Sequence, residues 1–391
     1  MKHYFETKDL SVGYNGSSLI HDINIGIEKG KILTLIGPNG AGKSTILKTI
    51  TKHLASIKGT VSVDRNEISQ WTPKEMAKQV AVVLTDRIRP ELMTCAEVVA
   101  MGRYPYTNML GKLTPEDRRI VEESLGRVHA LDLAEQDFST LSDGQRQRIL
   151  LARAICQEPE IIVLDEPTAY LDIRHKIELL DILREMAQEK GITVIMSLHE
   201  IDLAAKISDY LVCVKGETIA AFGKPEEVLQ QGAIEKLYDI QNGSYNLLFG
   251  SVELSKAAGD PKVFVIAGNG CGIDCYRYLQ KQQISFATGI LYENDVDTQV
   301  ARELSDHVVT APAFEPMNET HFIQAAKLLE DCELVIDAGT STWYALKNAG
   351  GGTSASEPTP TPEPAPVPND AGYTNVTAGD IASMLMSNGA K

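Results

Sequence analysis

The 391-residue chain lacks the features that would place it inside a membrane, outside the cell or on a nucleic acid. No run approaches the roughly 18 apolar residues that cross a bilayer, and Met1–Glu6 lacks the apolar core of a signal peptide. Basic charge is also scarce, because 37 Lys and Arg stand against 53 Asp and Glu, a formal net charge of −16. That balance argues against a nucleic-acid partner. We therefore expect a cytoplasmic protein, long enough for two or three domains.

Cysteine is scarce and scattered. The six cysteines are Cys95, Cys156, Cys213, Cys271, Cys275 and Cys332. None forms a CxxC pair, so the reduced thiols of a cytosolic protein are the expected state. Cys271 and Cys275 are separated by three residues, which is a weak indication of metal binding.

The chain does carry a phosphate-binding motif. Residues 37–44 read GPNGAGKS, which is GxxxxGK[ST], between the apolar run Ile32–Ile36 and a helical pattern that starts at Thr45. The glycines let the backbone curl so that successive N–H groups face one anion. Lys43 is then expected to reach the β- and γ-phosphates and Ser44 to hold Mg²⁺. The residues expected to bind the nucleotide are Gly37, Pro38, Asn39, Gly40, Ala41, Gly42, Lys43, Ser44 and Thr45.

A second phosphate element ends another apolar run. Ile161–Leu164 has the composition of a central parallel strand, and Asp165 and Glu166 follow it. Carboxylates at the carboxyl end of such a strand lie where α/β sheets bind ligands. Asp165 suits Mg²⁺, and Glu166 is expected to orient and polarise an attacking water. The two elements together predict an ATPase.

The stretch between these elements carries a family resemblance. Residues 141–145 read LSDGQ and open a helical pattern that runs to Ala154. With the strand that ends in Asp165 and Glu166, this motif makes the chain resemble an ABC-transporter nucleotide-binding subunit over about residues 4–245. The resemblance implies an α/β fold of the P-loop NTPase type, with a RecA-like core and a helical subdomain. It places the cassette at residues 1–250 and the helical subdomain at about 86–160.

The resemblance also implies a head-to-tail homodimer with ATP held between the two copies. In such a pair Ser142, Gly144 and Gln145 contact the nucleotide that the partner binds, because a helix N-terminus with exposed N–H groups attracts anions. Asp143 departs from the usual LSGGQ and adds a carboxylate beside this anion site.

Four further residues take expected roles from the resemblance. Tyr14 resembles the aromatic residue that stacks on adenine, and His199 resembles the switch histidine that contacts the γ-phosphate. Asp172 is similar to the acidic member of the loop through which the two active sites communicate. Thr85 occupies the place of a usual glutamine, and its hydroxyl is expected to hold a metal-bound water with a shorter reach.

The segment Gly102–Thr107 indicates one branch of this family. It reads GRYPYT and resembles the GRxPY segment of subunits that serve iron-siderophore, haem and cobalamin importers. The resemblance implies a peripheral ATPase on the cytoplasmic face of the cell membrane. Its partners are integral-membrane permease subunits and, indirectly, an extracellular or periplasmic substrate-binding protein. Two alternatives stay open, a soluble ABC ATPase of DNA repair or translation and a nucleotide-binding regulator without a transport role.

Residues 260–347 predict a second, Rossmann-like domain. The expected strands are 263–267, 285–291, 307–310 and 334–337, and the expected helices are 273–282, 298–305 and 319–329. This alternation is typical of a small parallel sheet. The glycine turn at 268–272 reads GNGCG, which leaves two interpretations, a nucleotide or other anionic ligand and a tight βα turn with no ligand.

The rest of the chain predicts no packed domain. Residues 348–371 are rich in Pro and Thr and read as an extended linker. Residues 372–391 resemble the opening strand and helix of a rhodanese-like domain without its catalytic loop, so no sulfur-transfer activity is expected. We therefore expect a disordered tail.

Overall fold

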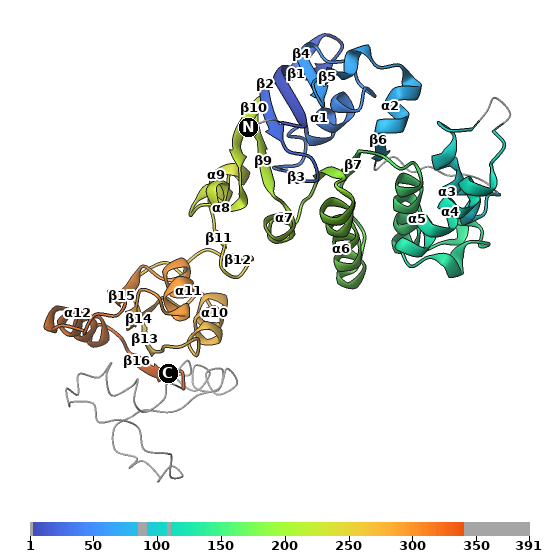
Figure 1. Cartoon of the computed structure of the whole chain (residues 1–391). Helices are drawn as coiled ribbons and strands as arrows, with labels where there is room; N and C mark the ends of the chain where they lie inside the picture. The colour runs from blue at the N-terminus through green and yellow to red at the C-terminus, as the bar shows by residue number, and fades with distance from the viewer. Residues whose placement is uncertain (1–2, 85–91, 108–110, 340–391) are drawn as a thin grey trace. The chain divides into compact units, whose positions relative to one another are not determined.

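The computed structural model describes residues 3–84, 92–107 and 111–339. It divides the chain into two compact units, residues 1–239 and 240–391 (Figure 1). Within the described ranges every helix is too short or too polar to span a bilayer. Thr85, the Pro/Thr-rich segment 348–371 and the rhodanese-like segment 372–391 lie outside the described residues.

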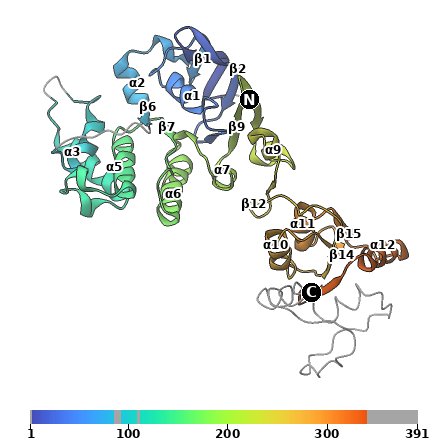
Figure 2. The ribbon, with the colours of Figure 1, turned by 180° about the vertical axis from the view of Figure 1, so that it is seen from behind.

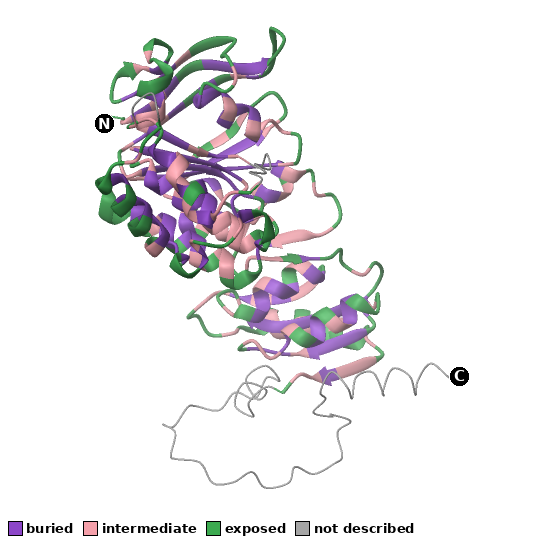
Figure 3. Cartoon of the chain, turned by 90° about the vertical axis from the view of Figure 1, so that its right-hand side faces the viewer, coloured by how far each residue is buried: buried purple, intermediate pink, exposed green. Residues whose placement is uncertain are grey.

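The first unit is built on a six-stranded sheet with the order β10-β9-β3-β8-β7-β6. Its strands are β3 (Ile32–Ile36), β6 (Val80–Val83), β7 (Ile161–Asp165), β8 (Thr193–Ser197), β9 (Tyr210–Lys215) and β10 (Thr218–Gly223). All run parallel except β10, which pairs antiparallel with β9. Every residue of β3, β7 and β8 is buried, as expected for parallel strands covered on both faces. Figure 3 shows strands coloured as buried in the interior of the molecule.

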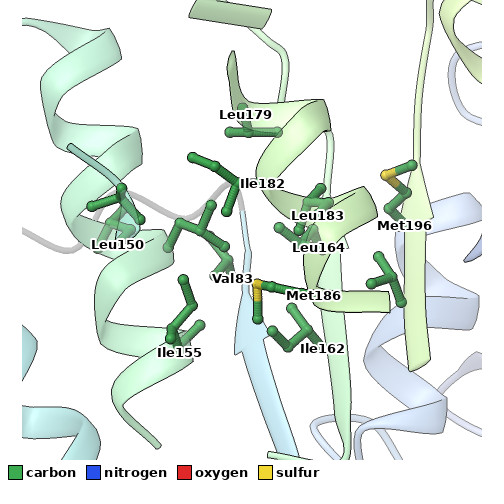
Figure 4. Close-up of a cluster of buried hydrophobic side chains, with 14 of the residues drawn as sticks. Val83, Leu150, Ile155, Ile162, Leu164, Leu179, Ile182, Leu183, Met186 and Met196 are labelled. Carbon is green, nitrogen blue, oxygen red and sulfur yellow. The ribbon is translucent and has the colours of Figure 1, made fainter. Parts of the chain in front are cut away.

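Alternate residues of these strands pack into two separate cores. Ile162 and Leu164 of β7 pack with α5 (Asp143–Cys156) and α6 (Ile173–Lys190) (Figure 4). Ile161 and Val163 point to the other face, where α1 (Lys43–Ile50) and an antiparallel sheet cover them. That sheet has the order β2-β1-β4-β5. Its strands are β1 (Phe5–Tyr14), β2 (Ser17–Ile27), β4 (Lys58–Val63) and β5 (Asn66–Glu67).

The helical subdomain contains α3 (Cys95–Ala100), α4 (Pro115–Arg127) and α5. Each of these helices begins with a capping box, whose first residues are Thr94, Thr114 and Ser142. Thr114 caps α4 with Pro115 at the first helical position, where proline is favoured because its missing N–H has no partner to lose. The unit's other helices are α2 (Pro73–Gln79), α7 (Ile201–Ile207), α8 (Pro225–Val228) and α9 (Ala233–Tyr238), with 3₁₀ turns at Ile68–Gln70, Met101–Arg103, Leu131–Leu133 and Phe138–Thr140.

The GRYPYT segment has a structural role inside this subdomain. The buried guanidinium of Arg103 donates from Nε to Asp117 Oδ1 (2.9 Å) and from Nη1 to the Cys156 carbonyl (2.8 Å). A Cβ on Gly102 would lie 2.4 Å from the Arg153 carbonyl oxygen. The segment therefore joins the start of α4 to the end of α5, and only glycine fits at residue 102.

The second unit holds a parallel sheet with the order β15-β14-β13-β16 (Figure 1). Figure 2 shows β14 and β15 of this sheet with α10, α11 and α12 from behind. Its strands are β13 (Val263–Ile266), β14 (Phe286–Tyr292), β15 (His307–Ala311) and β16 (Leu334–Asp337). Its helices α10 (Ile273–Lys281) and α11 (Val296–Leu304) contact each other, whereas α12 (Glu319–Glu330) packs beside a separate apolar cluster. Every element lies within about two residues of its predicted range, and the Rossmann-like architecture is present.

The boundary between the units differs from the predicted end of the cassette at residue 250. The structure divides the chain after Asp239, so the hairpin of β11 (Ser244–Asn246) and β12 (Ser251–Glu253) belongs to the second unit. Glu253 of this hairpin accepts hydrogen bonds from Arg277 of α10, and β11 contacts α11, so the hairpin packs on the second unit. Polar composition in this stretch does not reveal a contact made 24 residues further along the chain.

Candidate active site

Three neighbouring strands end at one edge of the large sheet. The phosphate loop follows β3, Asp165 closes β7, and Ser197 closes β8, which lies between the other two. His199 follows two residues after β8. Because carboxyl ends of parallel strands share one edge, the topology brings these distant segments together.

The phosphate loop is held in a conformation that requires glycine. Gly37, Gly40 and Gly42 have φ of 148°, 78° and 97°, a region that other residues rarely adopt. The side chain of Lys43 is buried, and its Nζ donates to the carbonyls of Gly37 (2.7 Å) and Pro38 (3.0 Å). Burial lowers the pKa of this ammonium, and the carboxylates of Glu166 and Asp165 oppose that shift.

The two carboxylates are fixed by the next strand. Asp165 is 3% exposed, and its Oδ1 accepts a hydrogen bond of 2.7 Å from Ser197 Oγ. The N–H of Glu166 donates to the same Ser197 Oγ at 2.9 Å. Glu166 has φ of 50°, a left-handed conformation that costs energy in a non-glycine residue. Its Oε1 lies 2.6 Å from His199 Nε2.

These groups surround a pocket of about 310 Å³. It is lined by Leu19, Asn39, Gly40, Gly42, Lys43, Ser44, Thr45, Glu166 and His199. The half-exposed Tyr14 lies beside it, with its hydroxyl 3.4 Å from Thr45 Oγ1. The structure thus brings together the predicted phosphate loop, Glu166 and His199.

Two residues of the site were not predicted from the sequence. Leu19 had no local signal, whereas Ser197 could have been noticed as the polar residue that ends an apolar strand.

The LSDGQ segment does not line this pocket. Ser142 caps α5, since its Oγ accepts from the Gln145 N–H (3.3 Å) while Gln145 Oε1 accepts from the Ser142 N–H (3.0 Å). The carboxylate of Asp143 pairs with Arg146 Nη1 at 2.8 Å. The charge added by the departure from LSGGQ is therefore balanced within the same helical turn.

Asp172 also lies outside the pocket lining and caps α6. Its carboxylate accepts from the His175 N–H (3.0 Å) and contacts His175 Nδ1 (2.9 Å). These bonds hold the pKa of Asp172 below its ordinary value, the backbone bond from His175 contributing most. The neighbouring side chains of Tyr170 and Ile173 are largely exposed, so this loop presents apolar surface beside a charged cap.

Comparison with known proteins decides the family. The sequence model of the ABC transporter family matches residues 20–169, and that of the MJ0874 family matches residues 286–390. The uncharacterised ABC transporter ATP-binding protein MJ0873 of Methanocaldococcus jannaschii is 44% identical over 287 residues, 73% of this chain and 99% of the relative. The chain belongs to the ABC transporter ATP-binding proteins. It binds ATP and hydrolyses it to drive transport.

A second relative and two solved structures agree with this family. The iron(3+)-hydroxamate import ATP-binding protein of Bacillus subtilis is 38% identical over 60% of this chain and 87% of its own length. An ABC transporter described as metal-chelate type, in an inward-facing conformation, is 27% identical with a TM-score of 0.54, over 60% and 89% of the two chains. A dimeric ATP-binding cassette bound to ADP and phosphate is 25% identical with a TM-score of 0.50, over 56% and 98%. The predicted P-loop NTPase fold is confirmed.

The glycine turn of the second unit binds the chain's own carboxylates. The N–H of Gly272 donates to both oxygens of the fully buried Asp297 (3.1 and 3.2 Å), and the N–H of Asn269 donates to Asp295 (2.9 Å). A phosphate would need these same donors, so the geometry favours the tight turn over a nucleotide site.

Among the described residues, no group of three or more His, Cys, Asp or Glu is arranged to hold a metal ion.

We expect the stability of this unit to fall as pH rises. Burial raises the pKa of Asp297 from 3.8 to about 6, so the folded state binds this proton more tightly than the unfolded state does. Its contribution is present below pH 3.8 and is lost as pH rises through about 6, by roughly 3 kcal/mol at most. Urea unfolding between pH 4 and 7.5, read by pulsed hydrogen exchange in β13 and β14, measures this. Asp297→Asn should flatten the profile, and an unchanged slope in that variant would contradict the assignment.

Proposed function

We propose that this ATPase energises the import of a metal chelate through separate membrane subunits, and that the pocket at the edge of β3, β8 and β7 is its hydrolytic site. The observation that carries the proposal is the meeting of Lys43, Glu166 and His199 in one pocket. Lys43 would turn from the carbonyls of Gly37 and Pro38 to the β- and γ-phosphates. Tyr14 would stack on the adenine.

The residues present fit a Mg²⁺ ion. Ser44 lines the pocket, and the buried carboxylate of Asp165 closes β7 at the same edge of the sheet, so the oxygen donors that Mg²⁺ prefers are at hand. A bound Mg²⁺ would neutralise charge on the phosphates. Glu166 would orient the attacking water and accept its proton, while His199, 2.6 Å from Glu166, would contact the γ-phosphate.

A second copy of the chain would complete the site. Ser142, Gly144 and Gln145 do not line the pocket of their own copy, yet the N-terminus of α5 suits an anion. A dimeric neighbour structure holds ADP and phosphate. In a head-to-tail homodimer these residues would reach the γ-phosphate bound by the partner, with Asp172 near the interface.

We expect Asp143→Asn to tighten ATP-driven dimerisation severalfold. The variant removes a negative charge near the partner's phosphates and leaves Arg146 positive, and a unit charge about 6 Å away is worth on the order of 1 kcal/mol. Sedimentation of a non-hydrolysing variant with ATP measures the dimerisation constant. Glu116→Gln is the matched control, because Glu116 pairs with Arg119 in the same i,i+3 geometry on α4. A constant equal to that of the control would show that Asp143 faces away from the nucleotide.

The membrane partner would dock on the helical subdomain. An apolar groove of about 590 Å³ lies between α3, α4 and the turn that follows. Its lining residues are Ala96, Glu97, Ala100, Leu113, Arg118, Val121, Glu122, Leu125, Leu131, Ala134 and Glu135. Apolar floor with a charged rim suits an amphipathic helix, so we assign the groove to a cytoplasmic helix of a permease subunit.

A metal chelate is the favoured cargo. One relative is named for import of iron(3+)-hydroxamate, and one structural neighbour is described as metal-chelate type. The GRYPYT segment resembles that of the same importer branch. Iron-siderophore, haem and cobalamin remain the candidates, delivered by a substrate-binding protein outside the cell. The chain would then work as a peripheral protein on the cytoplasmic face of the membrane.

Affinity purification from detergent-solubilised membranes of the source organism tests the partnership. The tagged chain should retain an integral-membrane protein, and Leu131→Glu, a half-exposed position in the groove, should lose that protein without losing ATP hydrolysis. Recovery of the chain with DNA-repair factors or ribosomes would instead support a soluble ABC ATPase. Recovery without any membrane protein would support a regulator.

A further inference from the structure

We propose that Ser197 is a positioning residue for the hydrolytic site, where its hydroxyl sets both the Asp165 carboxylate and the backbone at Glu166. The inference rests on the proposed site and adds a residue to it. It follows from the register of the sheet, from burial and from two hydrogen bonds.

The register places Ser197 between the two phosphate elements. It is the last residue of β8, paired with Asp165 of β7 on one side and with Leu35 of β3 on the other. It is fully buried. A polar group at such a position needs hydrogen-bond partners, and the partners it has are groups of the proposed site.

One hydroxyl serves both carboxylate residues. Its proton is donated to Asp165 Oδ1 (2.7 Å), and its lone pair accepts from the Glu166 N–H (2.9 Å). The first bond orients the carboxylate proposed to hold Mg²⁺. The second stabilises the left-handed backbone of Glu166, which directs that side chain towards His199.

A second tie holds the other end of this turn. Thr168 Oγ1 donates to Glu200 Oε2 (2.9 Å), and Lys176 Nζ donates to Glu200 Oε1 (2.6 Å). Glu200 follows His199 directly. The turn after β7 is therefore hydrogen-bonded at both ends to the segment that carries His199, through the buried side chains of Ser197 and Thr168.

Removing the hydroxyl should affect turnover more than binding. In Ser197→Ala the Glu166 N–H loses its acceptor and Asp165 Oδ1 loses a donor, while the phosphate loop is untouched. We expect kcat to fall by on the order of tenfold or more, with little change in the KM for ATP. The Mg²⁺ concentration for half-maximal activity should rise. Ser197→Thr, which restores a hydroxyl, should recover part of both losses.

Thr193→Val is the matched control. Thr193 is fully buried at the other end of the same strand, and its Oγ1 accepts from the Gly30 N–H (3.1 Å). This variant also loses a buried hydrogen bond, so it should lower stability and leave kcat and the Mg²⁺ dependence near the parent values.

Steady-state ATP hydrolysis by the full-length chain, titrated with ATP and with Mg²⁺, decides the matter. Loss of kcat with a raised Mg²⁺ requirement in Ser197→Ala alone supports the positioning role. Parent-like kinetics in Ser197→Ala, or an equal loss in Thr193→Val, overturns it. Glu166→Gln separates this failure from a failure of the proposed site. If Glu166→Gln stalls while Ser197→Ala does not, only the role of Ser197 is wrong, whereas normal turnover by Glu166→Gln overturns both.

Discussion

Replacing Glu166 with Gln is expected to leave ATP binding intact and to slow hydrolysis by on the order of a hundredfold or more. The amide cannot accept the proton of the attacking water, and a positioned general base typically contributes that much. The surrounding bonds should survive, because the Glu166 N–H still reaches Ser197 Oγ. With hydrolysis stalled, ATP should trap a closed dimer, which size-exclusion chromatography with light scattering would detect.

An exposed carboxylate outside the pocket provides the control for this experiment. Glu185 is exposed on α6, and Glu185→Gln should hydrolyse ATP like the parent chain. If Glu166→Gln turned over ATP at a rate close to that of Glu185→Gln, Glu166 would not be the residue that orients water.

Replacing Lys43 with Ala should weaken nucleotide binding itself by tenfold or more. Among the residues that the structure describes, Lys43 is the only lysine or arginine in the lining of the pocket, and a charge-assisted bond to phosphate is worth roughly 1.5–3 kcal/mol. Titration with a fluorescent ATP analogue measures the affinity directly. Lys48→Ala changes a lysine of the same helix that does not line the pocket, and it should bind like the parent. Equal affinity in the two variants would contradict the assignment of the phosphate loop.

Most of the fold and most of the candidate site could be predicted from local sequence patterns and from the family resemblance. The phosphate loop could be predicted because strand, glycines, lysine and helix stand within about a dozen consecutive residues, and Asp165 and Glu166 because they end a four-residue apolar run. The capping boxes that begin at Thr114 and Ser142 each involve only four consecutive residues. Their physical causes act over one turn of chain, so composition and spacing reveal them.

Most of what was not predicted depends on contacts between distant segments. Ser197 donates a hydrogen bond to Asp165, which lies 32 residues away in the sequence. The residues next to Ser197 in the sequence do not indicate that it pairs with Asp165. The glycine turn of the second unit resembled a ligand loop because the buried Asp297 that fills it lies 25 residues away from Gly272. The pairing of Asp143 with Arg146 was local and could have been predicted from the i,i+3 spacing.

Uptake of labelled chelates by cells tests whether this ATPase energises the import of a metal chelate. Cells of the source organism that carry either the parent chain or its Glu166→Gln variant would be supplied with radiolabelled ferric hydroxamate, haem or cobalamin. We expect one of these chelates to accumulate in cells with the parent chain and not in cells with the variant, while the other two labels are unaffected. Equal accumulation of all three labels in both strains would contradict this expectation.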